Sequence, residues 1–205
     1  MPKRPIFVTG IGTGVGKTII SAMLVEKLQA DYWKPIQSGD LEQSDTLMVK
    51  SLVSNPISYF YPEAYRLTQP FSPHKAAALD GIEIAPDKII LPETDNQLII
   101  EGAGGLMVPL NNNFLMIDLI KKLNAEVILV SRNYLGSINH TLLSLEALYS
   151  RDIPLKGIVF NGPVDEYSEQ AICAKANKIN IAHIPEIENI NKEILSSYME
   201  RIDFY

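Results

Sequence analysis

The sequence predicts an α/β fold in which helices cover both faces of a doubly wound, mainly parallel sheet. Short apolar runs alternate with longer amphipathic stretches along the chain. Several of the apolar runs carry no polar face, which is typical of strands covered on both sides. Glycines join the first apolar run to the first amphipathic stretch. At 205 residues the chain has the length of one domain, so we expect a single domain over residues 1–205.

The first half of the chain contains two predicted strands and three predicted helices. The apolar run 5–10 predicts a buried strand, and residues 18–29 predict a helix because apolar residues recur there every four positions. Residues 55–81 are predicted to be largely irregular, because prolines interrupt them. The other elements of this half are expected at 31–36 (strand), 45–53 (helix, capped by Ser44 or Asp45) and 73–81 (short helix).

Regular alternation of the two element types fills the second half of the chain. Apolar runs that favour strands lie at residues 97–105, 125–131, 155–162 and 181–187. Stretches with helical periodicity lie at residues 114–124, 137–152, 165–180 and 191–202. Ligands of open parallel sheets bind beyond the carboxyl ends of the strands, so residues that follow these strands are candidates for function.

Composition narrows the class of partner. The formal net charge of −6 provides no positive field for nucleic acid or an anionic membrane, so neither partner is expected. The apolar run near the N-terminus is too short for a signal peptide or a membrane span. The single cysteine, Cys173, lies in a predicted helix and is interpreted as a small packed hydrophobe. These features predict a cytoplasmic protein.

The stretch VTGIGTGVGKTII, residues 8–20, ends like a phosphate-binding P-loop. The common pattern has a glycine where this chain has Ile11, so the loop begins at Gly10 and its front half is one residue longer. Glycines let successive N–H groups face one anion at a helix N-terminus, where Lys17 would reach the outer phosphates. The alternative is a Gly-rich turn with an incidental lysine. The position between a strand and an amphipathic helix favours the phosphate loop and a P-loop NTPase-like fold.

Oxygen-bearing side chains near the loop suggest a magnesium site. Mg²⁺ is held by a few protein oxygens together with nucleotide phosphates and waters. The Thr18 hydroxyl directly follows the loop, and Glu101 follows an apolar strand, where P-loop enzymes place an acidic ligand. Asp45 is explained equally well as a helix N-cap, and its spacing does not decide between the two roles.

Lys34 ends the second predicted strand, between Trp33 and Pro35. From that position it would enter the same crevice as Lys17, and two ammonium groups in one site fit the transfer of a γ-phosphoryl group. A surface lysine that lays its stem along apolar residues explains the pattern equally well.

Eight segments of the chain, in this order, resemble those of the dethiobiotin synthetase family. They are VTGIGTGVGKT, KPIQSGD, SDT, SPHKAA, EGAGGLMVPL, LGSINHTLLSLEAL, GIVFNGP and HIPEI. Each segment is short, but the ordered set is specific and covers nearly the whole chain. The resemblance implies an ATP-dependent cyclo-ligase that forms carbon–nitrogen bonds in biotin biosynthesis.

The resemblance implies catalytic and metal-binding roles for five residues. Lys17 and Lys34 match the two active-site lysines of the family. Thr18, Asp45 and Glu101 match its Mg²⁺ ligands, so the resemblance favours the metal role over the helix cap for Asp45.

The resemblance also implies contacts with the nucleotide and the substrate. Ser38 matches a substrate contact. Asn139 matches a residue that reaches the carboxylate end of the substrate across a two-fold interface, so the resemblance implies a homodimer with its substrate site at that interface. The matching ATP-binding residues are Thr13, Gly14, Val15, Gly16, Lys17, Thr18, Ile19, Asp45, Glu101, Gly102, Ala103, Gly104, Asn161, Gly162, Pro185, Glu186 and Ile187.

The implied reaction joins 7,8-diaminopelargonate and CO₂ at the expense of ATP and with Mg²⁺. One amine of the substrate takes up CO₂ as a carbamate, which attacks the γ-phosphate and becomes a carbamic-phosphoric anhydride. The second amine closes the ring, and dethiobiotin, ADP and phosphate are released. The chain departs from some relatives at Gly14, where they carry an acidic residue.

Other nucleotide-binding classes fit the sequence less well. A partitioning-type ATPase switch, the main alternative, carries a signature lysine early in the loop, where this chain has Gly12. Small-molecule kinases bring an Arg-rich lid, and the arginines here do not cluster. A GTPase would show Asn-Lys-x-Asp, but Asn161 is followed by Gly-Pro-Val-Asp. A non-catalytic nucleotide-binding module would not need Lys34 and Glu101 together at strand ends.

Overall fold

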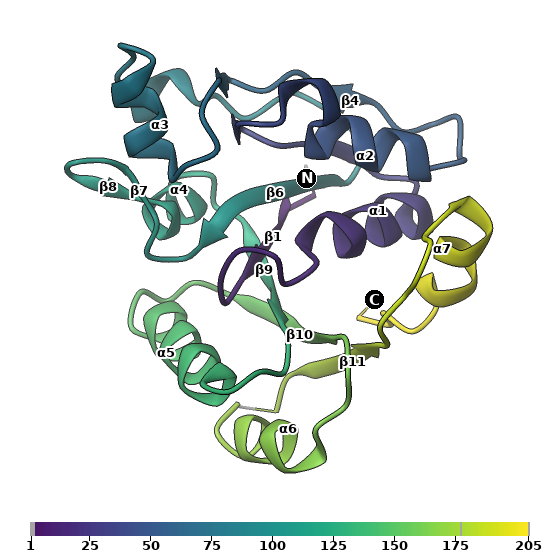
Figure 1. Ribbon diagram of the computed structural model, residues 1–205. Coiled ribbons are helices and arrows are strands. Elements are labelled where there is room, and N and C mark those ends of the chain that lie inside the picture. Colours follow the sequence, from purple (N-terminus) through teal and green to yellow (C-terminus); the bar gives the residue numbers. More distant parts are fainter. Residues whose placement is uncertain (1–2, 177, 205) are drawn as a thin grey trace.

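A seven-stranded sheet, in which every neighbouring pair of strands is parallel, forms the centre of the molecule. The computed structural model describes residues 3–176 and 178–204. The strand order is β11-β10-β9-β1-β6-β2-β4 (Figure 1). The strands are β1 (Ile6–Gly10), β2 (Asp31–Trp33), β4 (Phe60–Tyr61), β6 (Leu98–Gly105), β9 (Glu126–Ser131), β10 (Leu155–Asn161) and β11 (Asn180–Ile184).

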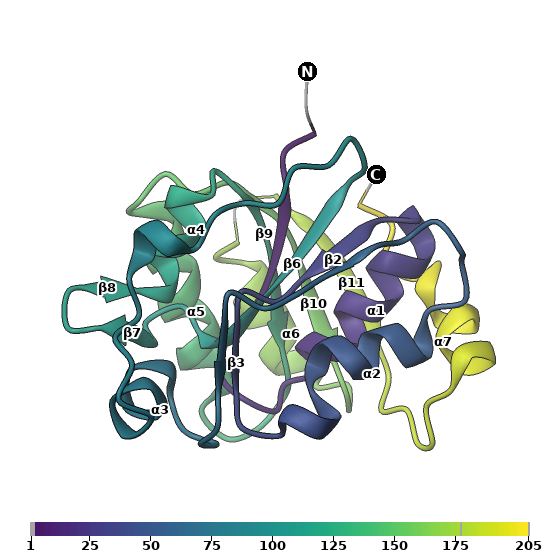
Figure 2. The ribbon, with the colours of Figure 1, turned by 90° about the horizontal axis from the view of Figure 1, so that it is seen from above.

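Helices cover both faces of this sheet, which confirms the predicted doubly wound α/β fold (Figures 1 and 2). One face carries α1 (Lys17–Leu28), α2 (Asp45–Leu52) and α7 (Lys192–Met199). The other face carries α4 (Met116–Lys122), α5 (Ser137–Tyr149) and α6 (Glu166–Cys173), with α3 (Pro73–Leu79) beside them.

Alternate residues of the central strands feed the two cores. Val8 and Ile99 point to the α1 face, whereas their neighbours Phe7 and Ile100 point to the α4 face. All four side chains are fully buried, and each contributes about 1.5–3 kcal/mol through removal from water. The absence of a polar face in these strands is therefore explained by burial on both sides.

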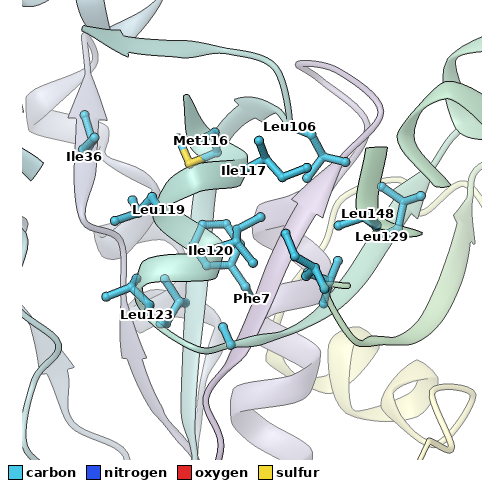
Figure 3. Close-up of a cluster of buried hydrophobic side chains, with 14 of the residues drawn as sticks. Phe7, Ile36, Leu106, Met116, Ile117, Leu119, Ile120, Leu123, Leu129 and Leu148 are labelled. Atoms are coloured by element: carbon cyan, nitrogen blue, oxygen red, sulfur yellow. The ribbon is translucent and has the colours of Figure 1, made fainter. Parts of the chain in front are cut away.

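The helix α4 packs into the core on its face of the sheet. Figure 3 shows α4 packing its apolar side chains, among them Ile117 and Ile120, toward Phe7 and Leu129 of the sheet. Leu148 of α5 belongs to the same cluster. The core thus joins β1, β9 and two helices.

The segment 55–81 is more regular than the sequence predicts. Its strand β4 pairs with β2, and its strand β5 (Tyr65–Leu67) pairs with β3 (Ile36–Ser38) in a separate two-stranded sheet. The predicted strand 31–36 is accordingly divided: β2 ends at Trp33, Lys34 and Pro35 follow, and β3 begins at Ile36. Two-residue and three-residue strands leave no periodicity that a sequence pattern could detect.

Several predicted boundaries also differ. The predicted helix 165–180 ends at Cys173, Asn177 lies outside the described residues, and β11 ends at Ile184 because Pro185 has no N–H for the ladder. Phe114 and Leu115, predicted as helix, form strand β8 against β7 (Pro109–Asn111). The remaining differences are small, namely α7 at 192–199 and short 3₁₀ turns at Leu41–Gln43 and Pro86–Lys88.

Within the described ranges 3–176 and 178–204, none of the helices combines the length and the apolar character that a bilayer crossing requires.

The carboxylate of Glu26 on α1 holds the chain segment that leaves α2. It accepts hydrogen bonds from the Ser54 N–H (2.8 Å) and hydroxyl (2.5 Å), and from the N–H (3.1 Å) and side-chain amide (3.2 Å) of Asn55. Burial alone would raise the pKa of Glu26, but these hydrogen bonds outweigh it and lower the pKa below its usual 4.5.

We expect Glu26→Gln to lower the free energy of unfolding by about 1–2 kcal/mol at neutral pH, because glutamine turns an NH₂ group toward these donors. Because the pKa of Glu26 is lowered in the folded state, its stabilisation is present above the unfolded pKa and is lost as the pH falls through the folded pKa. The difference between the two proteins should therefore shrink in acid. Urea unfolding of both proteins at neutral pH and in acid measures this difference. A substitution at an exposed glutamate, Glu83→Gln, is the control. A difference that does not depend on pH would contradict this account.

Candidate nucleotide-binding and catalytic site

Residues 11–16 form a loop that joins β1 to the N-terminus of α1. Gly16 has a φ of +97°, and a Cβ there would lie 2.1 Å from Nδ2 of Asn161, so only glycine fits. The Asn161 amide donates to the Val15 carbonyl at 2.9 Å, which ties the loop to the end of β10. Lys17 Nζ donates to the Gly12 carbonyl at 2.8 Å. The loop thus folds back over its own lysine at a helix N-terminus, as an anion-binding loop requires.

A cavity of about 720 Å³ opens between this loop, the ends of β2 and β6, and the start of α2. It brings together both candidate lysines, the three candidate metal ligands and the predicted substrate contact. These and the other predicted residues that line it are Thr13, Gly14, Gly16, Lys17, Thr18, Ile19, Lys34, Ser38, Asp45, Glu101, Ala103 and Gly104.

Three oxygen-bearing side chains converge inside the cavity. The Thr18 hydroxyl lies 2.7 Å from Oδ1 of Asp45 and 2.9 Å from Oε1 of Glu101. One hydroxyl proton serves only one of these bonds at a time, so the two carboxylate oxygens compete for the Thr18 proton. The described residues contain no group of three His, Cys, Asp or Glu side chains that would suit a metal. A cation here would therefore use the threonine with two carboxylates, a hard oxygen set that suits Mg²⁺.

Asp45 is the first residue of α2, and the cap of that helix is its neighbour. The Ser44 hydroxyl accepts from the Leu47 N–H at 3.4 Å, which leaves the Asp45 carboxylate free to face Thr18 and Lys34. Burial alone would raise the pKa of Asp45, but the ammonium of Lys34 and two hydrogen bonds lower it. Asp45 is therefore ionised at neutral pH.

Lys34 is buried between the two carboxylates, so the interpretation as a surface lysine is wrong. Its Nζ lies 2.7 Å from Oδ2 of Asp45 and 3.1 Å from Oε1 of Glu101, and the residue is only 5 % exposed. Burial alone would lower the pKa of Lys34, but the charges of Glu101 and Asp45 outweigh it and raise the pKa. Lys34 therefore stays protonated.

Lys17 differs from Lys34 in the direction of its pKa shift. Burial lowers the pKa of Lys17 to about 8; Glu101 opposes this shift and the nearby ammonium of Lys34 adds to it. Two cations thus face one cavity: the Lys34 ammonium lies within 3.1 Å of two carboxylates, whereas the Lys17 ammonium donates to the Gly12 carbonyl. Lys17 is the cation that an incoming anion would stabilise.

Glu101 lies inside β6 and not at its end, because four further residues of the strand follow it, up to Gly105. The register of β6 against β1 shifts after Glu101, which pairs with Val8, whereas Gly10 pairs with Gly105. A glutamate can stand in a central strand here because all its oxygens have partners. Oε1 faces Thr18 and Lys34, and Oε2 accepts from the Tyr32 phenol at 2.9 Å.

Tyr32 is a residue of the site that the sequence analysis missed. It is fully buried in β2, and burial together with the Glu101 charge raises the pKa of the phenol well above 10, so it acts as a donor. Its spacing of two residues from Lys34 places both side chains on the same face of the chain, which is the signal that could have found it.

Ser38 lines the cavity from the end of β3. Its hydroxyl is buried and has no hydrogen-bond partner among the described residues. A buried donor without a partner is costly, so this hydroxyl is available for a ligand. Pro70, which packs against the neighbouring Gly39, and Phe71 also line the cavity.

A second group of predicted nucleotide contacts lies outside the cavity, where β10 and β11 end. Asn161 pairs with Ile184 in the sheet, and the Gly162 N–H donates to the Ile184 carbonyl at 2.8 Å. Glu186 forms an ion pair with Arg132 at 2.5 Å beside Gly162. Asn161 reaches the loop directly, so this edge continues the site. Its other members are Pro185 and Ile187.

Asn139 is exposed near the start of α5 and does not line the cavity of its own chain. Its surroundings are apolar and exposed: Leu135 is fully exposed, and Ile138 and Leu143 are 36 % and 59 % exposed. Apolar side chains are thus exposed on both sides of Asn139 along the chain, and large exposed apolar surfaces are typical of interaction sites.

Comparison with known proteins identifies relatives over almost the whole length. A family model described as an AAA domain matches residues 4–194. The chain is 53 % identical to the ATP-dependent dethiobiotin synthetase BioD of Christiangramia forsetii over 98 % of this chain and 96 % of the relative. It is 49 % identical to the protein of the same name from Cytophaga hutchinsonii, over 97 % of each chain. A third, from Rhodopseudomonas palustris, is 45 % identical over 96 % of this chain and 93 % of the relative.

Solved structures with the same fold are much more distant in sequence. The cell division ATPase MinD of Pyrococcus furiosus superposes with a TM-score of 0.62 at 14 % identity, covering 98 % of this chain and 99 % of the other. A ParA family ATPase from Chlorobium tepidum gives 0.55 at 14 % identity, covering 98 % and 92 %. At this identity the similarity shows a shared P-loop NTPase fold and nothing about activity.

Proposed function

The chain belongs to the ATP-dependent dethiobiotin synthetase family, and on this premise we propose that it carboxylates 7,8-diaminopelargonate with CO₂ and closes the ring to dethiobiotin. The observation that carries the proposal is the convergence of Lys17, Lys34, Thr18, Asp45 and Glu101 in one cavity. ATP is the second substrate, and ADP and phosphate are the other products. We place the reaction in the cytoplasm and assign it to one P-loop synthetase domain, residues 1–205.

The chemistry concentrates negative charge in the cavity. One amine of the substrate adds to CO₂ and loses a proton, which gives a carbamate. A carbamate oxygen attacks the γ-phosphorus of ATP, the bond to the bridging oxygen breaks, and ADP leaves the carbamic-phosphoric anhydride. The second amine then attacks the carbonyl carbon, phosphate leaves, and a cyclic urea remains. Each step after carbamate formation benefits from fixed positive groups more than from a protein nucleophile.

The two lysines would supply those positive groups. Lys17 holds the Gly12 carbonyl and can exchange this contact for the γ-phosphate, which restores its ordinary basicity. Lys34 stays protonated beside Asp45 and Glu101 and can reach the carbamate or the transferring phosphoryl group. The N–H groups of the loop at the start of α1 would hold the β- and γ-phosphates.

Mg²⁺ fits the oxygen set of Thr18, Asp45 and Glu101. When bound, it would neutralise phosphate charge and align the β- and γ-phosphates for transfer. The chain's own contribution is to hold both carboxylates within hydrogen-bond distance of the Thr18 hydroxyl before any ligand arrives.

The adenine of ATP would lie at the ends of β10 and β11. Because the Asn161 NH₂ group is engaged with Val15, its oxygen is the atom left to face the base. An acceptor there suits the exocyclic amine of adenine and not the carbonyl oxygen of guanine. The Arg132–Glu186 ion pair closes the side of this edge next to Gly162.

The diamine would occupy the part of the cavity near Ser38, with its aliphatic chain running over Thr13 and Val108. These two residues also line a neighbouring cavity of about 400 Å³, most of whose other walls are apolar. We propose that the chain acts as a homodimer in which Asn139 of the partner protomer meets the substrate carboxylate. The exposure of Asn139 among apolar residues, away from the cavity of its own chain, supports this arrangement.

A partitioning-type ATPase switch is the alternative that shares this fold. Gly12 occupies the place of its signature lysine, and the buried Lys34 between two carboxylates has no purpose in hydrolysis alone. The synthetase and the switch also differ in their requirements, because only the synthetase needs the diamine and bicarbonate to release phosphate from ATP.

We expect Mg-ATP-dependent phosphate release only when both 7,8-diaminopelargonate and bicarbonate are present, because the carbamate is the attacking group. A coupled phosphate assay with each component omitted in turn measures this, and mass spectrometry of the product identifies the cyclic urea. Phosphate release at the same rate without the diamine would overturn the synthetase proposal in favour of the ATPase switch.

A further inference from the structure

Tyr32 lies beneath the site, in the middle of β2, and is fully buried. It pairs with Ile99 of β6, two residues before Glu101, so Tyr32 and Glu101 project from adjacent strands on the same face of the sheet. The Tyr32 hydroxyl donates to Oε2 of Glu101 at 2.9 Å. Tyr32 does not line the cavity, so it reaches the site only through this glutamate.

The two oxygens of Glu101 are divided between different partners. Oε2 faces Tyr32, on the side away from the cavity, whereas Oε1 faces Thr18 at 2.9 Å and Lys34 at 3.1 Å. The glutamate is 1 % exposed, and both of its oxygens have protein partners. The orientation of the carboxylate is therefore set by its protein partners.

We propose that Tyr32 is a positioning residue, which holds Oε2 so that Glu101 presents only Oε1 to a divalent cation beside Thr18. The proposal rests on the cation site of the proposed function. It extends that site by one residue that contacts neither nucleotide nor substrate.

The hydrogen bonds to the two oxygens of Glu101 differ in whether they persist when a substrate binds. The Lys34 ammonium contacts Glu101 and Asp45 and also faces the reacting centre. Its hydrogen bond to Oε1 of Glu101 therefore weakens when an anionic substrate binds. Tyr32 has no such competing partner in the cavity. Its hydrogen bond is the one that keeps the carboxylate in place, and such supporting contacts typically change metal affinity or activity by about 10- to 100-fold.

The test is Tyr32→Phe, which keeps the ring and removes only the hydroxyl. Mn²⁺ serves as the probe, and its dissociation constant is measured by electron paramagnetic resonance with saturating ADP. We expect this constant to rise about tenfold or more, while metal-free ADP binding and the KM for the diamine stay unchanged. The matched control is Tyr61→Phe, which removes a phenol that donates to the Glu93 carbonyl at 3.1 Å. An unchanged Mn²⁺ constant in Tyr32→Phe, with normal ADP binding, overturns the proposal.

Glu101→Gln separates this inference from the function on which it rests. If Glu101→Gln leaves Mn²⁺ binding intact, the cation site itself is wrong. If Glu101→Gln weakens Mn²⁺ binding and Tyr32→Phe does not, only the role of Tyr32 is wrong.

Tyr32→Phe leaves a buried carboxylate oxygen without its donor, and loss of folding would make that variant uninformative. The double variant Tyr32→Phe/Glu101→Gln keeps the proposal testable in that case, because it removes the carboxylate as well. If Tyr32 acts through Glu101, the double variant has the same Mn²⁺ constant as Glu101→Gln alone. A further loss in the double variant would show that Tyr32 acts by another route and would overturn the proposal.

Discussion

Replacement of Lys34 by alanine is expected to lower turnover by about 10²–10³, the usual effect of removing one preorganised group that stabilises developing negative charge. Lys34 is 5 % exposed and lies within 3.1 Å of Glu101 and 2.7 Å of Asp45, so its ammonium is fixed before the substrate binds. A group fixed in advance costs no reorganisation during the reaction. The loss should therefore appear mainly in turnover and not in the KM for ATP.

Steady-state phosphate release with saturating ATP, diamine and bicarbonate measures the effect, and Lys121→Ala, an exposed lysine on α4, is the control. Binding of the divalent cation should not weaken in Lys34→Ala, because the ammonium competes with the cation for the same two carboxylates. This outcome would distinguish Lys34 from Glu101 and Tyr32, which support the cation. Near-normal turnover in Lys34→Ala would remove this lysine from the mechanism.

The fold could be predicted because its central strands are apolar on both faces and alternate with helices along the chain. The same features did not predict the short elements. Strands β4 and β5 have two and three residues, and they form because β2 and β3 offer them an edge, which no local pattern records. The helix that ends at Cys173 was predicted too long for a related reason, since apolar spacing continued past its end.

Site residues could be predicted from the sequence where reactive side chains follow the end of a predicted strand. Lys17 and Lys34 fall at such places, and the structure brings both to one cavity. Glu101 was assigned to the end of its strand and lies inside it, because Tyr32 and Lys34 satisfy a carboxylate that would otherwise be unpaired in a sheet. The partnership with Tyr32 depends on the register of β2 against β6, which becomes visible only in three dimensions.

The position of Asn139 would be explained by a second copy of the chain. The family resemblance assigns it to the substrate, but it lies on the exposed surface of α5 and does not line the cavity of its own protomer. Both facts are satisfied if the substrate site is completed by a second copy of the chain. In a two-fold dimer the same surface is used by both protomers, so each cavity would receive Asn139 from its partner.

This arrangement makes a strong prediction for mixed dimers. Asn139→Ala is expected to lower kcat/KM for the diamine by about 10- to 100-fold, since a hydrogen bond to a charged group is lost. Lys34→Ala is impaired for a different reason, in the other half of the same site. When the two impaired proteins exchange subunits, a mixed dimer has one site with both defects and one site with neither.

Random exchange should therefore restore activity to about a quarter of the wild-type sites, because half of the dimers are mixed and each has one intact site. The assay is phosphate release before and after co-incubation, with separately tagged chains used to count the mixed dimers. A mixture of Lys34→Ala with Lys34→Ala/Asn139→Ala is the control, because no combination of these chains contains an intact site. If Asn139 served the cavity of its own chain, every site in the test mixture would keep one defect, and mixing would restore nothing.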